Sequence, residues 1–181
     1  MTPIPMGYFP KRTSKKPDWL QTPRVVEICS VSDCVSKPPT GWINRWLHNA
    51  LWVFDSPTIA WDVVPVDQWS EFDLYAYRLF PVEYESGEQN AFEIPRLIVV
   101  PISDSFEFLG FDAVSRSLGT HFECSPLSCN GAASDHEVNK YCLVNDSDSA
   151  FRLAREFSEG GSGTEPGPYY VAEVFRERKR N

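Results

Sequence analysis

Groups that could bind a metal ion or act as a nucleophile are concentrated in one stretch of the chain, residues 121–142. Three of the five cysteines and two of the three histidines lie there: His121, Cys124, Cys129, His136 and Cys142. Thiolates and imidazoles suit zinc, a borderline-soft ion that takes four ligands in structural sites. The three cysteines with either histidine therefore predict a zinc site. No other cofactor is predicted.

Two other interpretations of this stretch remain open. Cys124 or Cys129 could act as a nucleophile if His121 or His136 activated the thiol. An acidic neighbour would then orient the imidazole, and the candidates are Glu123 and Asp135. Alternatively, the cysteines are buried as small apolar side chains, which is common for this residue type. Whether the protein is an enzyme is therefore left undecided by these residues.

The charge is distributed unevenly along the chain. The formal net charge is −8, yet residues 1–24 and 176–181 are both rich in Lys and Arg. The body between these ends is therefore more acidic than the total suggests. An acidic body repels nucleic acid and attracts basic surfaces, so we expect a protein partner with a basic surface.

Three features predict a cytoplasmic location. The first ten residues lack the basic-then-apolar order of a signal peptide. No apolar run approaches the roughly 18 residues of a membrane span, so no membrane partner is expected. The odd number of cysteines, five, fits reduced thiols better than a disulfide framework. Two cysteine pairs share one four-residue gap, Cys29 with Cys34 and Cys124 with Cys129.

Helices are predicted in two main places. Residues 41–54 have apolar side chains at i, i+3, i+4, i+7 and i+8, which predicts a helix with Trp46 and Leu47 in the core. Residues 145–157 combine an acidic start with an apolar stripe and predict another helix. Ser56 followed by Pro57 is typical of the start of a third, short helix.

Strands are predicted between and after these helices. Alternating or β-branched residues indicate strands at 24–29, 72–80, 97–100, 106–114 and 168–175, with Gly110 at a bulge or a close backbone approach. No internal repeat is evident. This order predicts a single α+β domain with a mostly antiparallel sheet and two or three helices packed on one face.

The domain is predicted to span residues 24–176, between an extended, Pro- and Lys-rich arm (1–23) and a basic tail (177–181). The arm carries Tyr8, Phe9 and Trp19, which are predicted to bind a partner. Aromatic residues make up 14% of the chain, a high share that must be buried or engaged by a partner. The leading hypothesis is an acidic module for protein–protein interaction, of the inhibitor, immunity or assembly-subunit type. The alternative is an enzyme or metal-binding protein that uses residues 121–142.

Overall fold

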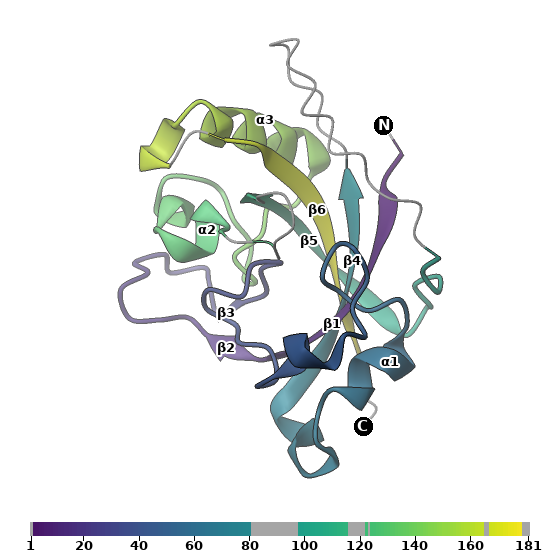
Figure 1. Cartoon of the computed structure of the whole chain (residues 1–181). Coiled ribbons are helices and arrows are strands. Elements are labelled where there is room, and N and C mark those ends of the chain that lie inside the picture. The colour runs from purple at the N-terminus through teal and green to yellow at the C-terminus, as the bar shows by residue number, and fades with distance from the viewer. Residues whose placement is uncertain (1, 81–97, 116–121, 123, 165–166, 179–181) are drawn as a thin grey trace.

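A four-stranded antiparallel sheet with the strand order β1-β4-β6-β5 forms the centre of the molecule (Figure 1). The computed structural model describes residues 2–80, 98–115, 122, 124–164 and 167–178. The sheet strands are β1 (Ile4–Arg12), β4 (Phe72–Phe80), β5 (Phe106–Ser115) and β6 (Tyr169–Glu177). A second sheet pairs β2 (Ser14–Lys15) with β3 (Glu27–Ile28). The predicted α+β class with a mostly antiparallel sheet is confirmed.

The helices are short except for the last. They are α1 (Pro57–Asp62), α2 (Pro126–Cys129) and α3 (Ser147–Ser158), with 3-10 turns η1 (Trp42–Arg45), η2 (Val66–Glu71), η3 (Ala132–Ser134) and η4 (Gly161–Gly163). The helix α3 lies along β6 and β5 (Figure 1). It begins where the Asp146 carboxylate accepts a hydrogen bond from the Ser149 amide, and it buries Ala150, Leu153, Ala154 and Phe157. Among the described residues, no helix is both long and apolar enough to cross a membrane.

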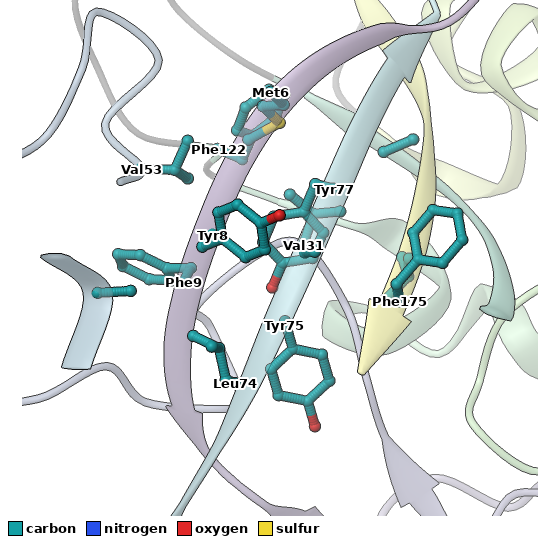
Figure 2. Packing of buried hydrophobic residues seen from close by; sticks show 14 of the residues in the cluster. Met6, Tyr8, Phe9, Val31, Val53, Leu74, Tyr75, Tyr77, Phe122 and Phe175 are labelled. Atoms are coloured by element: carbon teal, nitrogen blue, oxygen red, sulfur yellow. The ribbon is translucent and has the colours of Figure 1, made fainter. Parts of the chain in front are cut away.

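The predicted arm is in part a sheet strand. Residues 4–12 form β1, which pairs with β4 along its length. Prolines are tolerated there because β1 is an edge strand and Pro5 and Pro10 need not donate to a neighbour on both sides. Its aromatic side chains pack in the core beside Tyr75 and Tyr77 of β4, as Figure 2 shows for Tyr8 and Phe9.

The predicted helix at 41–54 is wrong. Only η1 is helical, and Trp46 and Leu47, which were expected in the core, are 81% and 44% exposed. The physical reason is Asn49, whose side-chain oxygen accepts hydrogen bonds from the amides of Leu51 (2.8 Å) and Val53 (3.4 Å). This local turn competes with the helix, as short polar side chains commonly do. The predicted strand at 97–100 is also absent over its described residues, 98–100.

The fold contains an internal repeat that was not predicted from the sequence. Asn139 makes the same turn as Asn49, since its side-chain oxygen accepts from the amides of Tyr141 (2.9 Å) and Leu143 (3.3 Å). Each asparagine follows a glycine of positive φ by eight residues and precedes the N-cap residue of a helix by seven. The three residues are Gly41, Asn49 and Ser56 in the first unit, and Gly131, Asn139 and Asp146 in the second. These positions differ by a constant 90 residues.

Each repeat also joins its turn to an edge strand through a glycine. In the first, Gly7 lies at a β-bulge of β1 and Tyr8 pairs with Phe54. In the second, Gly110 lies at a bulge of β5 and Phe111 pairs with Val144. A Cβ on either glycine would lie within 2.7 Å of the adjoining backbone oxygen, so no larger residue fits. The bulge or close approach predicted at Gly110 is confirmed.

Two tryptophans from one loop test the corrected placement of residues 41–54. Trp42 is 7% exposed and packs edge-on against Phe9 at 4.8 Å between ring centroids, whereas Trp46 is 81% exposed. We expect Trp42→Ala to lower the free energy of unfolding by about 3–5 kcal/mol. Trp46→Ala should change it by less than about 0.5 kcal/mol. Urea unfolding of both variants measures this, and a large loss for Trp46→Ala would contradict the exposed placement.

Candidate functional site

Three of the five cysteines converge where two loops meet. Cys34 lies in the loop after β3, while Cys124 and Cys129 flank and end α2. The thiols of these residues, called here the thiol cluster, are hydrogen-bonded to one another. Cys34 is exposed, the other two are half-buried, and all three are reduced.

The three thiols of the cluster have pKa values shifted in different directions. Hydrogen bonds from Cys124 and Cys129, together with Ser32 and the positive charge of Lys37, lower the pKa of Cys34. The hydrogen bonds that Cys124 makes to Cys129 and Cys34, and then burial, raise the pKa of Cys124. For Cys129, the bond to Cys124 favours the thiolate, but the bond to Cys34 and burial outweigh it and raise the pKa. These opposite pKa shifts favour the thiolate at Cys34 and the protonated thiols at Cys124 and Cys129.

Serine hydroxyls surround these sulfurs. The Ser32 hydroxyl lies 3.7 Å from Cys129 Sγ, and the Ser128 hydroxyl lies 3.8 Å from the same sulfur. The Cys34 amide donates to the Ser32 hydroxyl at 3.3 Å. Ser32 thus connects the loop that carries Cys34 to the end of α2.

Beneath the cluster, a buried lysine holds the first loop. Lys11 of β1 has no exposed surface, and its ammonium donates to the carbonyls of Ser30, Val31 and Ser32 at 2.5–2.8 Å. Burial lowers the pKa of Lys11 to about 8, although the negative charges of Asp33 and Asp112 oppose this shift. An ammonium with three carbonyl acceptors has all of its donors satisfied.

A buried carboxylate joins the first loop to the second. Asp112 of β5 accepts from the Ser30 hydroxyl (2.7 Å) and the Val31 amide (2.9 Å) through one oxygen. Its other oxygen accepts from the Ser125 hydroxyl (2.6 Å), next to Cys124. Burial raises the pKa of Asp112, while these hydrogen bonds and Lys11 oppose the shift. Asp112 thus bridges the two segments that carry the thiol cluster.

The residues predicted from the sequence are only partly brought together. Cys124 and Cys129 are in the thiol cluster, whereas Cys142 is buried and its thiol donates to the Leu127 carbonyl at 3.3 Å. His136 lies instead beside Ser162 and Glu156. His121 and Glu123 lie outside the described residues. Among the residues that are described, no group of three or more Cys, His, Asp or Glu is placed to hold a metal ion.

The three residues predicted to bind a partner differ in their exposure. Tyr8 and Phe9 are fully buried, so in this structure their side chains offer no surface to a partner. Trp19 is 50% exposed. The prediction missed Cys34, Lys11 and Asp112. The sequence places Cys34 five residues after Cys29, but in the structure the thiol of Cys34 interacts with Cys124 and Cys129.

No family model, no curated protein and no solved structure matches this chain.

Proposed function

We propose that this protein carries out thiol–disulfide exchange through the thiol cluster. The observation that supports it best is the position of Cys34, an exposed sulfur that accepts hydrogen bonds from two neighbouring thiols. Exchange needs an accessible thiolate and a second thiol within reach, and reactive cysteines are typically those with a lowered pKa. Both requirements are met by side chains that the buried Lys11 and Asp112 keep in place.

The proposed reaction has two steps. The Cys34 thiolate attacks one sulfur of a substrate disulfide, a mixed disulfide forms, and the first substrate thiolate leaves with the bonding electrons. Cys124 or Cys129 then attacks the Cys34 sulfur, so that an internal disulfide forms and the second substrate thiolate leaves. Two electrons pass from the two cysteines to the substrate. One proton comes from the attacking neighbour and the other from solvent. A dithiol reductant would restore the cluster by the reverse exchange.

Oxidised glutathione provides the test. We expect one internal disulfide that includes Cys34 and the release of two glutathione thiols per chain, identified by mass spectrometry. Cys34→Ser should abolish the release, while Cys142→Ser, which changes a buried thiol outside the cluster, should react like the parent. The first step should also persist in acid, because a thiol whose pKa is lowered stays ionised as the pH falls. Between pH 7 and pH 5 an ordinary thiol of pKa about 8.5 loses about 100-fold in thiolate. Cys34 should lose far less.

Elemental analysis of the same protein tests the alternative, a zinc site. The zinc site predicted from the sequence would appear as about one zinc per chain after purification without chelators. Zinc that protects Cys34, Cys124 and Cys129 from oxidised glutathione would contradict the exchange proposal. Metal-free protein in which Cys34 fails to form a disulfide would contradict it as well.

A second candidate function is binding of a protein partner by the acidic body, in a cytoplasm where thiols stay reduced. The observation that favours it is a difference between the repeats. The turn after Gly41 exposes three large apolar side chains, Ile43, Trp46 and Leu47. The equivalent positions after Gly131 hold an alanine and two polar residues: Ala133, His136 and Glu137. Apolar groups gathered on a surface commonly mark an interface. The net charge of −8 favours a partner with a basic surface.

This candidate function is tested by measuring how a basic protein binds to the immobilised chain. Trp46→Ala should weaken its binding without unfolding the chain, and higher salt should slow association while dissociation changes little. If the parent and Trp46→Ala bind the basic protein with equal affinity, the exposed turn is not part of the interface. If the association rate does not change with salt concentration, the acidic charge does not attract the partner.

A further inference from the structure

An exposed tryptophan lies beside the end of α2. Carbon Cζ3 of the Trp19 ring lies 3.8 Å from the position that a Cβ would take on Gly131. Gly131 follows Cys129 by two residues and has a φ of 85°, in the left-handed region where glycine is favoured. Because Gly131 has no side chain, the indole can approach the backbone here. The ring is thus a neighbour of the chain segment that leads away from the thiol cluster.

The segment that carries Trp19 is anchored on both sides. Leu20 is 1% exposed and packs in the core, and its amide donates to the Pro17 carbonyl at 3.1 Å. Beyond it, the Thr22 hydroxyl lies 3.3 Å from that of Ser134, in the η3 turn that Gly131 begins. Leu20 therefore fixes the turn from inside. Trp19, which precedes the anchored Leu20, is 50% exposed.

We infer that Trp19 selects the substrate of the thiol cluster, favouring a disulfide carried by a peptide or protein with an apolar side chain near its cysteine. This inference rests on the proposed exchange function. A half-exposed indole offers a large apolar face with few rotatable bonds, which is why tryptophan dominates many binding surfaces. A peptide whose sulfur reached Cys34 would lie near the α2–Gly131 segment and could pack an apolar side chain on the ring. Oxidised glutathione contains no such side chain.

The experiment compares two probes on four proteins. The probes are oxidised glutathione and a short cyclic disulfide peptide with leucine or phenylalanine beside each cysteine. The proteins are the parent, Trp19→Ala, Trp19→Phe and a matched control, Trp69→Ala. Trp69 is 46% exposed and packs against Trp61, so it has the same residue type as Trp19 and a similar exposure. Second-order rate constants of Cys34 oxidation are measured, and circular dichroism verifies that each variant is folded.

We expect Trp19→Ala to lower the rate constant for the peptide about tenfold, the equivalent of about 1.4 kcal/mol. The rate constant for oxidised glutathione should fall less than twofold. Trp19→Phe should recover much of the peptide rate, and Trp69→Ala should leave the ratio of the two rates unchanged. If Trp19→Ala alters neither rate, or both equally, the selectivity inference is overturned while the exchange function stands. If the parent exchanges with neither probe, the exchange function itself fails.

Discussion

The arrangement of this protein around its thiols depends on one buried pair of opposite charges. Lys11 and Asp112 come from the two edge strands of the sheet, β1 and β5. The ammonium holds the 30–32 loop through three carbonyls, and the carboxylate holds the same loop and Ser125. These contacts, together with the thiols and Ser32, join the loop that carries Cys34 to the segment that carries Cys124.

Such a pair is costly for a protein to bury. Removing two charges from water costs several kcal/mol for each ion, and their attraction returns this only when every donor and acceptor is satisfied. Both shifts in pKa reflect the cost, since burial pulls the pKa of Lys11 down and that of Asp112 up. The hydrogen bonds of the pair end on the loops that carry the cysteines. The pair is therefore better explained by positioning of these loops than by stability alone.

The spacing of the cysteines predicted only part of the thiol cluster. The sequence shows two pairs with a four-residue gap, Cys29 with Cys34 and Cys124 with Cys129. The second pair meets in the cluster, and Cys34 joins it from the other loop. The repeat is carried by two identical positions, Gly41 with Gly131 and Asn49 with Asn139, whereas every residue between them differs. Lys11 gave no signal in the sequence because a lysine in a basic segment is ordinarily solvated.

Regular elements were predictable where periodicity and caps agree. The alternation in 72–80 and the stripe after Asp146 correspond to β4 and α3. Residues 41–54 have an equally good helical stripe, yet Asn49 redirects the backbone and Trp46 and Trp52 adopt positive φ. A side-chain hydrogen bond to the backbone, which periodicity does not represent, decides that segment.

Titration with arsenite tests most directly whether the buried pair brings the three thiols together. Trivalent arsenic is soft and binds convergent thiolates, as other soft ions do. We predict that the folded parent binds one arsenic per chain through Cys34 and a neighbouring thiol of the cluster, so that Cys34 becomes resistant to alkylation, while Asp112→Asn binds it more weakly. If Cys34 remains open to alkylation at saturating arsenite, or if Asp112→Asn binds as tightly as the parent, the account of this site is contradicted.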